Sequence, residues 1–435
     1  DAYNIAMGYN AGKLITTGIK NTLIGGLAGD ALTTGEGSTA VGYAALSSET
    51  SGGKNTAIGS KSQNSVNNSG NGNNTSVGFE TMSGATTAIG TTAIGSSCMS
   101  GVMTGDFNTA VGYLAGLSIT SGTRNVLMGA QAGDALIGGS DNIAIGQEAL
   151  SAEDGHGKNI AIGSLTLQSQ NAGADAYNVA IGHNAGLSVT TGIENVLIGG
   201  LTGDALTTGQ YNVALGTNAL GTEDTGSRNT AIGHAALSGL NYDGTGYNTA
   251  VGFWAGLSLT TGVKNTIIGG LAGDAMNTAN NNTAVGFDAL TSEVKGGRNV
   301  AIGVSALYTQ SNSSDLDIYN VAVGYNAGYA MTTGVQNTLI GGLAGDALTT
   351  GTDNVAVGYL SLSTEDGHGR NVAVGKAALR NLDAGADAYN VAVGFEAGTA
   401  VTTGIQNTII GGLAGDALTT GMNNVAIGYN ALSLE

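Results

Sequence analysis

The residues best suited to chemistry in this sequence are pairs of neighbouring carboxylates in Gly-containing turns. The pairs are Glu153–Asp154, Glu223–Asp224 and Glu365–Asp366. Two adjacent carboxylates and a nearby backbone carbonyl supply the oxygen ligands that Ca²⁺ prefers. Each pair is followed by a cation, at Lys158, Arg228 or Arg370, and this pattern is typical of a solvated, partly neutralised turn. The sequence therefore favours a structural role for these turns, with calcium binding as the alternative.

Few other side chains could support catalysis. The four histidines are scattered, and two of them, His156 and His368, occupy the same Asp-Gly-His-Gly turn 212 residues apart, too far along the chain to act together. The only cysteine, Cys98, stands where other repeats hold Ala, which predicts a buried thiol that packs as a small apolar side chain. Because no nucleophile lies beside a general base, we expect no enzymatic activity, no catalytic residue, no cofactor and no metal on which the fold depends.

All of these residues lie in a short unit that repeats along the whole sequence. A unit begins with Asn-(Val/Ile/Thr)-x-(aliphatic)-Gly, with Ser38 or Thr91 replacing the Asn twice, and it spans 17, 19 or 21 residues. We number its residues from the Asn, which is position 1. The 25 units start at residues 4, 21, 38, 55, 74, 91, 108, 125, 142, 159, 178, 195, 212, 229, 248, 265, 282, 299, 320, 337, 354, 371, 390, 407 and 424. A repeat this short and regular predicts one continuous β-solenoid region over residues 1–435.

The first five residues of each unit predict a short strand that ends in a glycine turn. Position 2 is always β-branched and position 4 always aliphatic or Met, as strands favour. Position 5 is Gly in every unit, and the sequence contains no Pro, so we expect glycine to supply the positive φ that the turn needs. Representative structural turn residues are Gly8, Gly25, Gly42, Gly182, Gly199 and Gly428.

Four unit types alternate and form a super-repeat of about 70 residues. The units that start at residues 178, 195, 212 and 229 exemplify the first to fourth types, and the fourth type is the longest. Leu or Ile at position 3 occurs only in second-type units, which carry Gly or Ala at position 6, so we expect these two positions to exchange volume. The Asn/Ser-rich loops 63–73 and 308–319 should bulge out without disturbing the stack.

Position 6 often carries an aromatic residue that offers a flat apolar face. Such rings could stack on sugars, or they could simply shield the surface of a sheet. The candidates for glycan stacking are Tyr9, Tyr113, Phe253, Tyr325 and Phe395.

Both faces of the expected strand are apolar, and this predicts self-association. One face can fill the interior of the coil, but the other needs a cover that the chain itself does not supply. We expect positions 2 and 4 to face partner chains, and the small residues at positions 3 and 8 to lie inside the coil.

Charge and hydropathy exclude several classes of partner. The net charge of −18 argues against a nucleic-acid groove and against binding to an anionic membrane surface. No apolar run approaches the 18 residues that a membrane-spanning helix needs, so we expect no membrane insertion. The first residues match the end of a fourth-type unit and the last ones lie inside a third-type unit, so we expect a fragment of a longer fibre.

The repeated motif Asn-(Val/Thr)-Ala-(Ile/Val)-Gly resembles the head repeat of trimeric autotransporter adhesins. Its longer form, seen in residues 248–262 and 320–334, is similar to repeats of phage tail fibres. The resemblance implies a left-handed parallel β-roll, a homotrimeric rod and a role in attachment.

From the repeat and this resemblance we expect the structural shaft of a phage tail fibre. The shaft would extend and present a host-attachment module outside these residues, which would contact the host cell surface or its glycans. The alternatives are a bacterial trimeric surface adhesin whose β-roll binds host or glycan surfaces directly, and a spike-type polysaccharide depolymerase, for which the short units leave little room. The expected location is a virion tail fibre or the extracellular cell surface.

Overall fold

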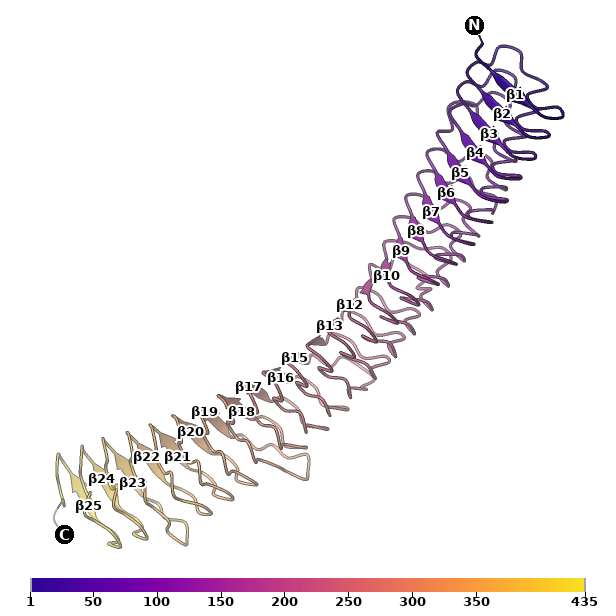
Figure 1. The fold of residues 1–435 in the computed structure, drawn as a ribbon. Coiled ribbons are helices and arrows are strands. Elements are labelled where there is room, and N and C mark those ends of the chain that lie inside the picture. Colours follow the sequence, from indigo (N-terminus) through magenta and orange to yellow (C-terminus); the bar gives the residue numbers. More distant parts are fainter. Residues whose placement is uncertain (1, 434–435) are drawn as a thin grey trace. The chain divides into compact units, whose positions relative to one another are not determined.

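The computed structural model describes residues 2–433 and confirms an all-β fold. The chain forms a parallel β-solenoid of about 25 turns, and every turn contributes one three-residue strand at positions 2–4 of its unit (Figure 1). The described residues contain no helix, and therefore none long and apolar enough to cross a membrane. The turns divide into two compact units, which meet in the sequence at Ala214 and Leu215.

The strands of the first unit are β1 (Ile5–Met7), β2 (Thr22–Ile24), β3 (Thr39–Val41), β4 (Thr56–Ile58), β5 (Thr75–Val77), β6 (Thr92–Ile94), β7 (Thr109–Val111), β8 (Val126–Met128), β9 (Ile143–Ile145), β10 (Ile160–Ile162), β11 (Val179–Ile181) and β12 (Val196–Ile198). Strand β13 (Val213–Leu215) spans the boundary. The second unit contains β14 (Thr230–Ile232), β15 (Thr249–Val251), β16 (Thr266–Ile268), β17 (Thr283–Val285), β18 (Val300–Ile302), β19 (Val321–Val323), β20 (Thr338–Ile340), β21 (Val355–Val357), β22 (Val372–Val374), β23 (Val391–Val393), β24 (Thr408–Ile410) and β25 (Val425–Ile427).

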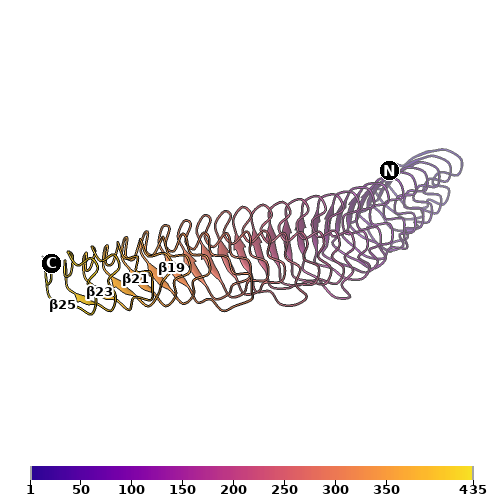
Figure 2. The same ribbon diagram turned by 90° about the horizontal axis from the view of Figure 1, so that it is seen from below.

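Within each unit, successive strands pair in parallel and in register. Position 2 of one coil lies opposite position 2 of the next, as in the pair Val179 and Val196 in β11 and β12. The same pairing joins Val391 to Thr408 in β23 and β24. The coils therefore follow one another in sequence order, and the strand of each coil lies beside the strand of the preceding coil (Figure 2).

Positions 3, 8 and 12 lie in the core of most coils, joined by position 9 where it is a leucine such as Leu150 or Leu220. In the coil that starts at residue 178, Ala180, Ala185 and Val189 are fully buried, whereas Val179 is only partly buried and Ile181 is exposed. The prediction that the small residues at positions 3 and 8 fill the coil is confirmed. Positions 2 and 4 point outward along the surface of the sheet.

Bulky residues at position 3 pack against glycine at position 9, not against position 6 as the sequence suggested. A Cβ on Gly12 or on Gly29 would lie 2.8 Å from a methyl carbon of Leu23, so only glycine leaves room for that side chain. Position 6 belongs to the outer surface, where the ring of Tyr43 approaches Gly26 of the preceding coil. A bulky residue at position 3 is therefore matched by a glycine elsewhere, as predicted, but that glycine is at position 9 and not at position 6.

Glycine at position 5 ends every strand with a backbone that other residues rarely adopt. Its φ ranges from 119° at Gly428 to 146° at Gly112 and Gly394. A Cβ on Gly182 would lie 2.3 Å from the carbonyl oxygen of Gly199 in the next coil, well inside contact distance. Both the dihedral angle and the close approach of adjacent coils therefore require glycine here.

Positive φ is not confined to glycine, which the sequence did not reveal. In the coil that starts at residue 142, Glu148, Leu150 and Lys158 have φ of 53°, 54° and 64°. Each donates its backbone N–H to a carbonyl of a neighbouring coil, at 3.0 Å, 3.0 Å and 3.1 Å respectively. Left-handed backbone costs a non-glycine residue about 1–2 kcal/mol, so these inter-coil hydrogen bonds help to offset the strain.

The two long Asn/Ser-rich loops leave the sheet intact, as predicted. Strands β4 and β5 pair in register across loop 63–73, and β18 and β19 do so across loop 308–319. Isolated parallel bridges, Gly53 with Asn71 and Gly297 with Asp317, also tie the loops to the adjacent coil.

Candidate functional site

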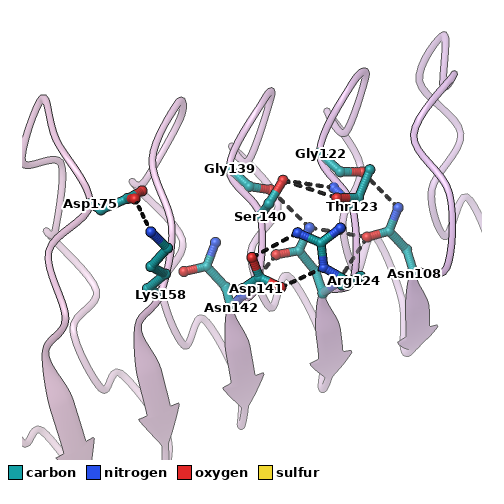
Figure 3. A network of polar contacts seen from close by, with 11 residues as sticks. Asn108, Gly122, Thr123, Arg124, Gly139, Ser140, Asp141, Asn142, Lys158 and Asp175 are labelled. Carbon is teal, nitrogen blue, oxygen red and sulfur yellow. Dashed lines mark hydrogen bonds and ion pairs between the residues drawn. The ribbon is translucent and has the colours of Figure 1, made fainter.

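A ladder of buried asparagines runs inside the coils at position 1. The Oδ1 atom of Asn125 accepts a hydrogen bond from the backbone N–H of Asn142 in the next coil at 3.0 Å. Its Nδ2 atom donates to the carbonyl oxygen of Gly139, across its own coil, at 2.9 Å. Figure 3 shows the neighbouring members Asn108 and Asn142 and the accepting glycines Gly122 and Gly139. Asn125 thus joins two coils and closes its own.

Sequence reasoning missed this ladder because a recurring Asn is typical of exposed turns. Its signal was the alternation of the strand: position 1 shares a face with position 3, which is inside the coil. Where Ser38 replaces Asn, its hydroxyl still accepts the N–H of Asn55, at 3.3 Å.

The glutamates of the acidic turns are fully buried, so the prediction of solvated turns was wrong for them. Glu153, Glu223 and Glu365 stand at position 12, where the other unit types hold core residues such as Leu32 and Val189. Glu49 and Glu293 occupy the same position and are equally buried, although the sequence analysis did not single them out. The aspartates that follow Glu153, Glu223 and Glu365 are at least partly exposed.

The buried carboxylates of Glu49, Glu223, Glu293 and Glu365 bind both their own turn and the next coil. Glu223 Oε1 accepts the N–H of Gly226 at 2.7 Å, and its Oε2 accepts the N–H of Tyr242 at 3.2 Å. Glu365 repeats this pattern with the N–H groups of His368 and Ala384, at 3.0 Å and 3.2 Å. The glutamates of these turns therefore lie in the core and connect neighbouring coils by hydrogen bonds.

Burial also changes the acidity of these groups. Desolvation raises the pKa of Glu49 and Glu223, and backbone hydrogen bonds only partly oppose it. The pKa of Asp204 and Asp346 is raised for the same reason. The folded protein thus holds these protons more tightly than the unfolded chain.

We expect the melting temperature to rise as the pH falls from 7 to 5. A folded-state pKa above its unfolded value gives stability that is fully present below the unfolded pKa and is lost as the pH rises through the folded one. The variant carrying Glu49→Gln and Glu223→Gln should show a shallower slope in melting curves recorded over this range. A melting temperature that falls on mild acidification would contradict the assigned pKa directions.

The cations that follow the acidic pairs bind other partners than the predicted ones. Lys158 Nζ donates to Asp175 Oδ2 at 2.5 Å, a contact with the next coil that Figure 3 shows. Arg370 likewise contacts Asp387 of the next coil, and both cations lie over a tyrosine ring. Because these ion pairs are solvent-exposed, water screens them and they contribute little to stability. They join Lys158 and Arg370 to the following coil.

The structure brings a histidine to two of the three acidic pairs. Ligand atoms of Glu153, Asp154 and His156 all lie within 4.8 Å of one another. The same arrangement recurs in Glu365, Asp366 and His368. The third pair, Glu223–Asp224, has Gly226 where the other turns have histidine.

The candidate glycan-stacking residues lie on the outward surface. Tyr9, Tyr113, Phe253, Tyr325 and Phe395 are all exposed. Phe253 stacks on Trp254, with 4.7 Å between ring centroids, and on His234, at 5.4 Å. The rings of all five residues are accessible to solvent.

One pocket, of about 290 Å³, lies beside loop 308–319 in the second unit. Lys264, Lys295 and Arg298 line it together with Asp315 and Asp317. Arg298 already contacts Asp317 and the hydroxyl of Tyr319. The pocket walls therefore carry both signs of charge, with no group arranged for catalysis among these lining residues.

Comparison with known proteins gives no relative: no known protein-family model matches the chain, and no curated protein sequence matches it.

Proposed function

We propose that this chain is the structural shaft of a homotrimeric fibre. The observation that carries the proposal is a row of exposed apolar side chains on the outer face of the sheet. At position 4 the row contains Ile58, Ile94, Met128, Ile181, Ile268, Ile302, Ile340, Val393 and Ile410. Exposed rings at position 6, including Tyr43, Tyr113, Phe287 and Tyr359, flank it. A patch this extensive marks an interaction surface.

The partner that fits this surface best is another copy of the same chain. The apolar row repeats at every coil, so a matching partner needs apolar groups with the same spacing along its length. A second copy of this face has the same spacing because it has the same sequence. In a closed symmetric assembly every copy then buries its apolar face in the same way. Three chains around one axis, in a left-handed roll, are what the adhesin-like repeat implies.

A mechanical role agrees with the chemistry inside the coils. The ladder hydrogen bonds, the asparagine ladder and the buried glutamates all join one coil to the next. Contacts of this kind make a stack of coils resist bending and extension. Such a stack can act as a spacer that carries a separate attachment module. A phage tail fibre on a virion is the favoured setting, and the proposed role is not enzymatic.

We expect charge introduced into the apolar row to reduce the oligomer. Ile94→Lys together with Ile340→Lys would place ammonium groups in the proposed interface, where burial without a partner is costly. Sedimentation should then show a lower mass than for the unaltered chain, with the strand signal in circular dichroism retained. The matched control, Thr34→Lys with Thr261→Lys, changes exposed turns away from the row and should keep the mass. An unchanged mass for the Ile94/Ile340 variant would contradict the proposal.

The second candidate is a surface adhesin whose coils bind glycans directly. The exposed stack of Phe253 on Trp254 favours it, because sugar rings bind flat aromatic faces. A glycan array that detects binding by the unaltered chain, and none after Phe253→Ala with Trp254→Ala, would favour the adhesin over the shaft.

A further inference from the structure

Among the residues that vary between the five turns with a buried glutamate, the one three residues after the glutamate is either glycine or histidine. Three of them have glycine there, Gly52, Gly226 and Gly296, and two have histidine, His156 and His368. A Cβ on these glycines would lie 2.4–2.8 Å from the carboxylate of the glutamate in the same turn. The carboxylate therefore uses the space that glycine leaves open. A histidine in this place requires a different carboxylate position, yet the chain carries it twice.

In these two turns the histidine joins the glutamate and the aspartate in one cluster. The ligand atoms of each triad lie within 4.8 Å of one another. The distance from Nδ1 of the histidine to Oε1 of the glutamate is 3.7 Å for His156 and 3.3 Å for His368. One nitrogen and two carboxylate donors thus converge at the surface end of a buried glutamate.

The first cluster contains buried donor atoms that the protein itself leaves unsatisfied. Glu153 is fully buried, and its Oε2 atom approaches the backbone of Ala172 in the next coil without reaching hydrogen-bond geometry. The Nδ1 atom of His156 is buried and also has no hydrogen-bond partner. Buried polar atoms without partners are rare in proteins and call for an explanation such as a bound ion. The nearest cation, Lys158, is engaged by Asp175.

We propose that each Glu-Asp-Gly-His turn binds one divalent transition-metal ion of the Zn²⁺ class. An imidazole with two carboxylates suits Zn²⁺, Co²⁺ or Ni²⁺, whereas Ca²⁺ prefers six to eight oxygen ligands. In tetrahedral geometry, zinc–ligand bonds of about 2.0–2.2 Å place two donors of one ion roughly 3.3–3.6 Å apart. Ion binding therefore draws the three side chains together from the present separations, which are all within 4.8 Å. Water or a donor from a second chain completes the coordination.

Titration of the EDTA-treated full chain with zinc sulfate in a calorimeter tests this site. The expected result is saturable binding of two Zn²⁺ ions per chain. Co²⁺ should bind at the same two sites, and its visible d–d absorption should differ from that of Co²⁺ in water because an imidazole nitrogen is one of its ligands. Calcium chloride at the same concentration should not displace them. Absence of saturable zinc uptake, or displacement by equimolar Ca²⁺, would overturn the proposal.

Variants of the histidines locate the sites. His156→Gly with His368→Gly gives these turns the residue that the Gly52, Gly226 and Gly296 turns already carry, so the fold should tolerate it, and both ions should be lost. Either single variant should retain one ion. His183→Ala with His234→Ala removes two histidines elsewhere and should still bind two. Retention of both ions by the His156/His368 variant would show that zinc binds somewhere else and would contradict the assignment.

Discussion

We expect Gly182→Ala to destabilise the solenoid strongly, as should the same change at other position-5 glycines. The backbone at Gly182 has φ of 138°, a region that is almost reserved for glycine, and the added Cβ would lie 2.3 Å from the carbonyl oxygen of Gly199. Backbone strain of this kind costs about 1–3 kcal/mol, and the clash forces adjacent coils apart in addition. The free energy of unfolding in urea, followed by circular dichroism, should fall by about 3 kcal/mol or more.

Two other glycines separate the dihedral strain from the clash. Gly173 has φ of 69° but no atom within 4 Å of its Cβ position, so Gly173→Ala should cost only about 1 kcal/mol. Gly70 has neither a positive φ nor a close neighbour, and Gly70→Ala should change the free energy of unfolding by less than about 0.5 kcal/mol. Equal effects of all three substitutions would show that the spacing of adjacent coils does not depend on glycine at position 5.

We expect the second largest effect from Asn125→Ala in the asparagine ladder. The substitution leaves the buried N–H of Asn142 and the buried carbonyl oxygen of Gly139 without these hydrogen bonds. Each unsatisfied group costs about 1–3 kcal/mol, so the free energy of unfolding should fall by about 2–6 kcal/mol. Urea unfolding of the variant and the unaltered chain under identical conditions measures the difference.

A serine at the same place provides the matched control. Ser38 already occupies position 1 in one coil and accepts the N–H of the next coil. Asn125→Ser should therefore keep the acceptor for Asn142, lose the Nδ2 bonds to Gly139 and Asn108, and destabilise the protein less than Asn125→Ala. If the serine and alanine variants unfold alike, the inter-coil bond from Asn142 contributes nothing measurable.

The repeat made the strand and its glycine turn predictable from sequence. A β-branched residue such as Val179 at position 2 favours a strand, and a glycine such as Gly182 at position 5 favours a turn with positive φ. Both preferences are local, so the sequence shows them without knowledge of the fold. The in-register pairing then follows from the constant unit length. Positions 3 and 8 could be placed inside the coil because Ala180 and Ala185 are small.

Polar core residues were not predictable from residue type. Asn125 and Glu223 look like turn or surface residues, because most Asn and Glu side chains are exposed. The strand alternation places position 1 on the face of position 3, but only the path of the backbone shows that position 12 lies in the same column as Leu32 and Val189. The pairing of Leu23 with Gly12 and Gly29 has the same origin, because it depends on how the chain turns between positions 5 and 12.

The proposed trimer and its role as a fibre shaft remain predictions, and the apolar row at position 4 is their physical basis. Measuring the mass of the full chain by sedimentation equilibrium tests this claim most directly. The account predicts a species of three chains at micromolar protein concentration, with Ile94, Ile181 and Ile340 withdrawn from solvent. A well-folded single chain with its outer sheet face open to water would contradict it.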